Sequence, residues 1–170
     1  MKRARAVRVA IAVVLGAAAC GTAEPGGMSG PTINNRLSPQ EAQSRVISAD
    51  ILAREPVANR TMVKHILIGW RDKANAYGGN IDPRAANRTK QQAEAQVEAI
   101  LEKLRAGGDF DALMTEYSED KGSAASGRPF EVSPDAHLVI EFRQLGLRLQ
   151  VGEVGVTESD FGFHVIKRLE

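Results

Sequence analysis

Histidines are the residues of this chain whose type and context first suggest chemistry. The 170 residues include three of them, His65, His137 and His164, and they lie too far apart in the sequence for their spacing to indicate a metal site. His65 interrupts the apolar residues 62–68, and His164 lies among the apolar residues 161–166. A single histidine in a strand is more often a hydrogen-bonded core residue than a catalyst. Because two histidines share this context, they are the first candidates for a functional site.

Familiar catalytic motifs are absent from the sequence. It has no phosphate-binding glycine-rich motif, no HExxH, no paired cysteines and no GxSxG. The sequence therefore predicts neither a metal nor a cofactor.

Charge excludes a further class of function. The chain has 22 Lys and Arg residues and 21 Asp and Glu residues, and four of the basic ones (Lys2, Arg3, Arg5 and Arg8) precede Cys20. Without those four, 18 basic and 21 acidic residues leave a net charge of −3. Such a chain has no bulk positive charge for nucleic acid, so we expect no nucleic-acid partner.

The first 19 residues have the pattern of a secretory signal peptide. The basic start is followed by an apolar run over residues 9–19, which is shorter than the ~20 residues that a membrane-spanning helix needs. Residues 17–20 (AAAC) resemble a bacterial lipoprotein box, with Ala17 where the box usually has leucine. We expect an exported protein anchored through lipid on Cys20 in the cell envelope, on the periplasmic side or in the outer membrane. Cleavage by an ordinary signal peptidase after Ala19 is the alternative.

A lone cysteine supports the lipid anchor. Cys20 is the only cysteine of the chain, so it cannot form a disulfide within it. A free thiol in an exported protein needs an explanation, and lipidation supplies one. The alternative is a cysteine without a role in a segment that is discarded or unfolded.

Composition and periodicity divide the rest of the chain into three parts. Residues 20–39 are rich in Gly, Pro, Ser, Thr and Asn and are expected to form a flexible tether. Residues 40–59 are a lead-in, where a capping pattern at residues 38–41 predicts a short helix to about Arg54. Residues 60–170 are expected to form one α+β domain, a four-stranded antiparallel sheet with about four helices packed around it. The strands are expected at 62–68, 128–132, 154–157 and 163–169, and the helices at 89–106, 110–117 and 137–149, with a loop or short helical turn at 118–126.

Five sequence motifs, in order, resemble the parvulin family of peptidyl-prolyl cis/trans isomerases. They are VKHILI at 63–68, AGGDFDAL followed by YSED within 106–120, SAASG at 123–127, LQVGEV at 149–154 and FGFHVI at 161–166. Each motif alone is weak, but together they cover about 110 residues in the order and spacing of the family. The resemblance implies a parvulin-like sandwich and isomerisation of X-Pro bonds without a cofactor. The implied partners are proline-containing unfolded or exported polypeptides.

The resemblance also assigns residues to the site. His65 and His164 are similar to the family's paired histidines beneath the active site, and Asp120 to the position held by aspartate or cysteine. Ser159 resembles the hydroxyl position before the last strand. Leu138 and Phe142 are similar to two walls of the pocket for the substrate proline ring.

One segment departs from the family pattern. Residues 128–131 (RPFE) replace the usual glycine-rich sequence, and Pro129 stands where a leucine normally helps to line the proline pocket. We expect a reshaped pocket in which Pro129 and Phe130 take part. This departure leaves two alternatives to an isomerase: a peptide-binding chaperone module without catalysis, and a lipoprotein that uses the fold as a spacer.

Overall fold

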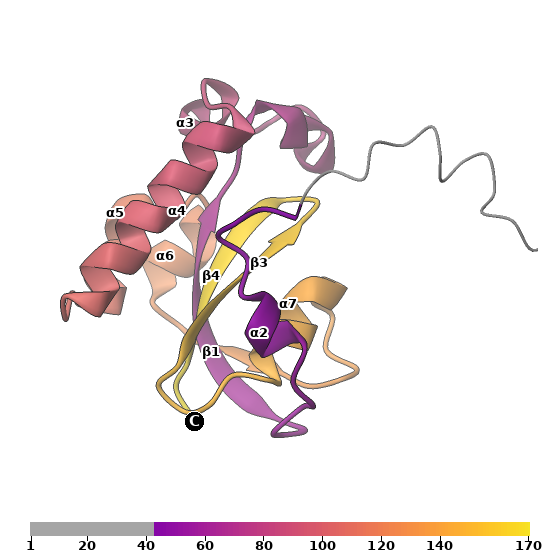
Figure 1. Cartoon of the computed structure of the whole chain (residues 1–170). Helices are drawn as coiled ribbons and strands as arrows, with labels where there is room; N and C mark the ends of the chain where they lie inside the picture. The colour runs from indigo at the N-terminus through magenta and orange to yellow at the C-terminus, as the bar shows by residue number, and fades with distance from the viewer. Residues whose placement is uncertain (1–42) are drawn as a thin grey trace, which may run out of the picture. The chain divides into compact units, whose positions relative to one another are not determined.

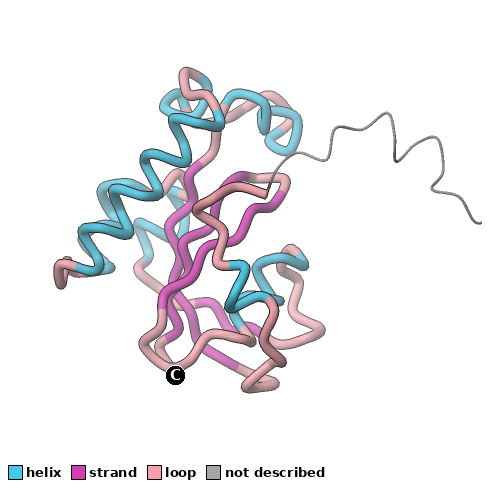
Figure 2. Tube along the Cα trace, viewed as in Figure 1, coloured by secondary structure: helices cyan, strands magenta, loops and turns pink. Residues whose placement is uncertain are grey.

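Four antiparallel strands form the central sheet of the computed structural model, which describes residues 43–170 (Figure 2). The strands are β1 (Thr61–Ile68), β2 (Phe130–Val132), β3 (Val154–Ser159) and β4 (Gly162–Arg168). They are hydrogen-bonded in the order β2-β1-β4-β3, so β1 and β4 are the central pair. The expected four-stranded antiparallel sheet is confirmed.

Helices pack on both faces of this sheet. Figure 1 shows α4 and α5 on one side and α2 and α7 on the other. Thr89 and Gln92 form a capping box at the start of α4, and Asp109 caps α5 by accepting from the Ala112 N–H. Within the described residues the helical segments are α2 (Ala49–Leu52), η1 (Arg71–Tyr77), α3 (Pro83–Ala86), α4 (Lys90–Arg105), α5 (Phe110–Tyr117), α6 (Lys121–Ser126) and α7 (Ile140–Gly146).

Side chains alternate along β1 and β4, so each strand contributes to two cores. Ile66, Ile68, Phe163 and Val165 point to one face, where they are fully buried against α4 and α5. Val63 and Ile166 point to the opposite face, where they pack against α7 and Ile51 of α2. This second face also carries His65, Leu67 and His164, which line a cleft.

A glycine allows the β3–β4 hairpin to lie close to β1. Residues 160 and 161 form the turn between Ser159 and Gly162, which pair across the hairpin. Gly162 has φ +139°, and a Cβ atom there would lie 2.5 Å from the Ile68 carbonyl oxygen. Only glycine fits this approach.

The lead-in differs from its predicted form. Within the described residues its helix is limited to α2, because Ser48 pairs with the outer edge of β3. The Ser48 N–H donates to the Val156 carbonyl, and the Val156 N–H donates to Ser48 Oγ. A backbone that completes a sheet edge cannot also follow a helix through Ser48.

Two other segments have different bounds from those expected. The polar loop after β1, residues 71–87, for which no helix was expected, contains η1 and α3, with Asp82 as the N-cap of α3. Helix α7 begins at Ile140 rather than near His137, because residues 133–138 turn back on themselves through the hydrogen bonds Ala136 N–H to Ser133 O and Leu138 N–H to Ala136 O.

The predicted signal peptide, Cys20, the whole tether and the first three residues of the lead-in lie outside the described residues. Among residues 43–170, every helix is too short or too polar to cross a membrane.

Candidate active site

The register of the two central strands brings the histidines together. His65 lies opposite Ile166, and His164 lies opposite Leu67, so the histidines are diagonal neighbours on one face of the β1–β4 pair. Their Nδ1 atoms are 3.2 Å apart, and both side chains are buried. Strand alternation and the register of β1 and β4 therefore place the two imidazoles in contact.

The two histidines belong to a chain of four polar side chains. His65 Nε2 lies 3.0 Å from Asp120 Oδ2, and His164 Nε2 lies 2.7 Å from Ser159 Oγ. Ser159 Oγ also accepts from the Phe161 N–H at 3.1 Å. The chain runs from the β3–β4 hairpin, across the centre of the sheet, to the residue that precedes α6.

Asp120 sets the direction of this chain. An ionised carboxylate can only accept a hydrogen bond. His65 Nε2 therefore carries a proton and donates a hydrogen bond to Asp120. With both imidazoles neutral, His65 Nδ1 must accept from the Nδ1–H of His164, whose Nε2 then accepts from the Ser159 hydroxyl. Every link has one direction, and every polar atom in it has a partner.

The environment of the site lowers the pKa values of both Asp120 and His164. The hydrogen bond from His65 lowers the pKa of the Asp120 carboxyl well below its usual range, and the hydrogen bonds from Ser123 add to the effect. Burial, with repulsion from His65, lowers the pKa of His164 from 6.5 to about 3. At neutral pH the site therefore holds a negative Asp120 and a neutral His164.

Asp120 has a second task in the fold. It is the N-cap of α6: its Oδ1 accepts from the Ser123 N–H at 3.2 Å, while its Oδ2 faces His65. Ser123 Oγ lies 3.2 Å from His65 Nε2 and donates to the Asp120 carbonyl. Asp120 and Ser123, at the start of α6, therefore both contact His65 of β1.

A cleft of about 390 Å³ lies over this chain. One part is apolar, with Phe130, Leu138, Val139 and Phe142 as its walls. The rings of Phe130 and Phe142 each meet the His65 ring edge to face, with 5.2 Å between centroids, and Phe142 meets His164 at 5.5 Å. The apolar walls therefore adjoin the imidazoles directly.

The expected site residues are gathered here, with one exception. His65, Asp120, His164, Leu138, Phe142 and Phe130 line the cleft, and Ser159 lies behind it as the partner of His164. Pro129 is exposed and is not among the residues that line the cleft. Since β2 begins at Phe130 and side chains alternate, Phe130 rather than Pro129 turns toward His65, and the expected part of Pro129 in the pocket is wrong.

Sequence reasoning missed several residues of the cleft. Tyr77 lies at its polar side, donates from its hydroxyl to the Phe161 carbonyl, and has its pKa raised to about 12 by burial and by the nearby carboxylates Glu119, Asp120 and Asp82. Nothing in the polar loop distinguishes this tyrosine before folding. Ser123 does not line the cleft, but it contacts His65 and Asp120, and its place three residues after Asp120 fits the helix-cap pattern. The other missed lining residues are Leu67, Glu119, Lys121, His137, Val139 and Phe161.

Metal-ligating residues do not cluster in residues 43–170: no group of three or more His, Cys, Asp or Glu side chains could hold a metal ion there.

Fold and site together define an α+β domain with a histidine–aspartate chain beneath an aromatic cleft. A family model described as the PPIC-type PPIase domain matches residues 49–170. The chain therefore belongs to the PPIC-type, or parvulin, family of peptidyl-prolyl isomerase domains.

Curated relatives agree with this family. The chain is 33% identical over 148 residues to a parvulin-like PPIase of Rickettsia conorii, a match that covers 81% of this chain and 52% of that protein. It is 35% identical over 112 residues to the chaperone SurA of Chromohalobacter salexigens, covering 65% of this chain and 22% of that protein. The chain thus matches only about half, or less, of the length of these relatives.

A solved structure of the same fold is the solution structure of TbPIN1. It superimposes with a TM-score of 0.56 at 21% identity, covering 66% of this chain and 99% of that chain. At this identity the likeness shows the fold alone.

Proposed function

We propose that the domain catalyses cis/trans isomerisation of X-Pro bonds in exported or envelope polypeptides. The observation that carries this proposal is the apolar cleft built directly on the chain from Ser159 to Asp120. Family membership supports the same activity.

The reaction asks little covalent chemistry of a protein. The X-Pro bond is nearly balanced between its isomers, but rotation costs about 18–20 kcal/mol because the twisted amide loses its resonance. A catalyst therefore has to bind the twisted amide better than either planar isomer, without a nucleophile.

The two parts of the cleft match the two parts of this task. Phe130, Leu138, Val139 and Phe142 would hold the proline ring, since they are its apolar walls. Asp120 is a charged group that lines the same cleft, with its side chain 32% exposed. Its negative charge would disfavour the polarised, planar carbonyl and so favour the twisted amide. His65 holds the carboxylate in place and ionised, and His164 and Ser159 fix the proton on His65.

A proline-peptide assay tests this function. Purified protein lacking residues 1–19 should accelerate the exchange between cis and trans isomers of a short X-Pro peptide, measured by NMR exchange spectroscopy. Binding of the peptide without acceleration, together with suppression of aggregation of an unfolded client, would instead identify the non-catalytic chaperone. A folded protein that neither binds the peptide nor accelerates its isomerisation would support the third alternative, a lipoprotein that uses the fold as a spacer.

We further propose that lipid on Cys20 anchors the protein at a membrane of the cell envelope. The signal-like first 19 residues and the lone cysteine support this proposal. Detergent partitioning and the intact mass of the mature protein test it, with Cys20→Ser as the control. A mature chain that begins after Cys20, or that carries an unmodified thiol, would refute it.

A further inference from the structure

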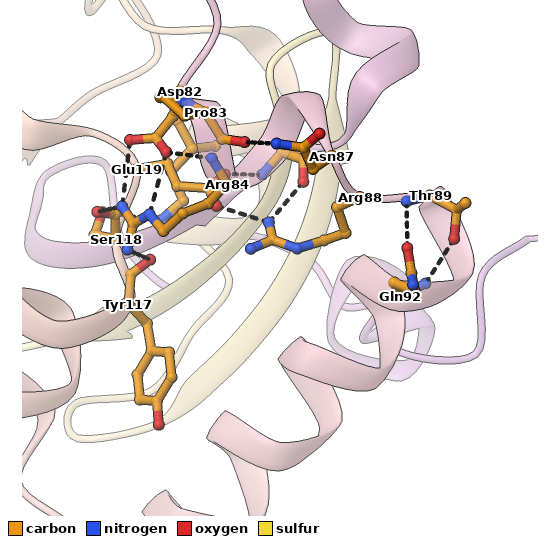
Figure 3. Close-up of polar contacts among 12 residues, drawn as sticks. Asp82, Pro83, Arg84, Asn87, Arg88, Thr89, Gln92, Tyr117, Ser118 and Glu119 are labelled. Carbon is orange, nitrogen blue, oxygen red and sulfur yellow. Dashed lines mark hydrogen bonds and ion pairs between the residues drawn. The ribbon is translucent and has the colours of Figure 1, made fainter.

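Residues 118–120, the corner between α5 and α6, place Asp120 beside His65. Two of its three residues, Ser118 and Glu119, are polar and buried. Its position must therefore be set by hydrogen bonds and charges. Ser118 supplies one of these bonds, and three charged residues supply the others. We call these three, Arg84, Arg88 and Glu119, the clamp (Figure 3).

The first part of the clamp ties the corner to the strand of His65. β2 pairs with β1 only over residues 61–63, so the same edge of β1 needs other partners farther along. Ser118 Oγ accepts from the Leu67 N–H, the Glu119 N–H donates to the Leu67 carbonyl, and Glu119 Oε2 accepts from the Gly69 N–H at 2.6 Å. The corner thus takes the place of a neighbouring strand, starting two residues beyond His65.

Arg88 completes the environment of the Glu119 carboxylate. Only 2% of the Glu119 side chain is exposed, and a carboxylate so buried needs a charged partner. Arg88 Nη1 donates to Glu119 Oε1 at 2.7 Å and to the Gly69 carbonyl at 2.8 Å. One guanidinium therefore joins the corner to the end of β1.

Arg84 holds the corner from the solvent side. Its guanidinium donates to the carbonyl oxygens of Glu116, Tyr117 and Ser118, the last at 2.9 Å. These carbonyls end α5, where a cation is favourable. Asp82 orients Arg84 through the bond from Nε to Oδ1 at 3.2 Å. Figure 3 shows Arg84 between Asp82 and Ser118.

We propose that the clamp is a positioning device that holds Asp120 in the geometry at which it bonds His65 and faces the substrate. The inference rests on the proposed isomerase function. Arg84, Arg88 and Glu119 act through Asp120: both carboxylate oxygens of Glu119 are engaged by Gly69 and Arg88, and Arg84 faces backbone carbonyls. Small displacements of an active group have large effects on turnover, so the clamp should be visible in kcat.

Arg84→Gln is the sharpest variant. The Arg84 side chain is 43% exposed, and its partner Asp82, with a side chain 7% exposed, keeps Lys121 Nζ at 3.3 Å. The replacement therefore leaves no buried charge without a partner, and the protein should fold. We expect kcat to fall about tenfold, less than the ~100-fold that a misplacement of 1 Å can cost, with KM within about twofold of the parent value. Arg45→Gln replaces an exposed arginine that pairs with Glu98, away from the cleft, and should leave kcat unchanged.

A double-mutant cycle separates positioning from a general structural effect. If Arg84 acts through Asp120, then adding Arg84→Gln to Asp120→Asn should lower kcat no further. A full, additive loss in the double variant, or an unchanged kcat in a folded Arg84→Gln protein, overturns the proposal.

A readout without catalysis distinguishes failure of the clamp from failure of the proposed function. In the parent protein, ¹⁵N NMR of the imidazoles should show His65 protonated at Nε2 and not at Nδ1. Arg84→Gln and Glu119→Gln should both raise the population of the other tautomer, whereas Arg45→Gln should not. If the parent protein proves to have no isomerase activity, an unchanged His65 tautomer in both clamp variants still overturns the clamp, and a shifted one supports it.

Discussion

Replacing Asp120 by Asn tests the polar chain most directly, because it removes the charge and keeps the shape. The carboxylate uses Oδ1 for the Ser123 N–H and Oδ2 for His65 Nε2. An amide has one oxygen. If that oxygen stays on Ser123, the amide NH₂ faces His65 and the whole chain must reverse: His65 then donates from Nδ1, and His164 donates from Nε2 to Ser159.

The expected loss can be estimated for turnover and for stability. We predict that Asp120→Asn lowers kcat at least about tenfold, roughly 1.4 kcal/mol in the barrier. Exchange of a charge-assisted hydrogen bond for a neutral one should cost about 1 kcal/mol of stability, and less if solvent screens the part-exposed carboxylate. Such a loss lowers the melting temperature by about 3–5 °C in a domain of this size. Asp120→Ala also loses the N-cap of α6, which should cost about 1 kcal/mol more.

The assay compares three variants. Peptide isomerisation is measured by NMR exchange, with melting curves for each protein; Asp111→Asn is the matched control, because its carboxylate lies on the exposed side of α5 and pairs with Lys64. Asp120→Asn and Asp120→Ala should lose similar turnover while differing in stability, and the control should lose none. Near-parent turnover in folded Asp120→Asn would refute the role of the charge.

Three further predictions address the core of the site, the cleft and the hairpin. First, folding lowers the pKa of His164 from 6.5 to about 3, so the unfolded chain binds more protons between these two pH values. The free energy of unfolding should therefore fall as the pH falls through this window, by up to about 1.4 kcal/mol per pH unit. Denaturant titrations should show this slope flattened in His164→Gln and kept in the exposed control His137→Gln; equal slopes would contradict it. Second, Phe130→Ala should raise KM with little change in kcat, because it removes an apolar wall that binds both isomers and the twisted form alike; an unchanged KM would remove Phe130 from the pocket. Third, Gly162→Ala should lower the melting temperature sharply, since its Cβ would lie 2.5 Å from the Ile68 carbonyl; a melting temperature equal to that of the parent would contradict this close approach.

Features that depend on local pattern were mostly predictable from the sequence. Apolar runs placed β1 and β4, and the periodicity of apolar residues located α4 and α5 within a residue or two. The contact between His65 and His164 depends on strand register, which the sequence does not state. It could be expected only through the resemblance to parvulins.

The clamp lay beyond prediction for a different reason. Glu119 and Arg88 are 31 residues apart, and Ser118 and Leu67 are 51 apart, so nothing in the local sequence links them. The sequence alone indicates two solvated carboxylates at Glu119 and Asp120, and only the fold places Glu119 against the end of β1. The helix expected across Ser48 failed similarly, because pairing with the β3 edge outweighed its local helix signal.

The polar chain also explains how this sheet tolerates a site inside its core. Each unpartnered polar group on an apolar face would cost about 1–3 kcal/mol of folding free energy. The domain avoids this cost because the hydroxyl of Ser159 and the ring nitrogens of His164 and His65 all have hydrogen-bond partners. Such a chain is stable only as a whole, since a change at one link leaves the next link with two donors or two acceptors. Asp120 is the one member with substantial exposure. In the proposed mechanism, the charge that faces the substrate is therefore also the group that sets the proton positions of the buried chain, and the two roles cannot be altered independently.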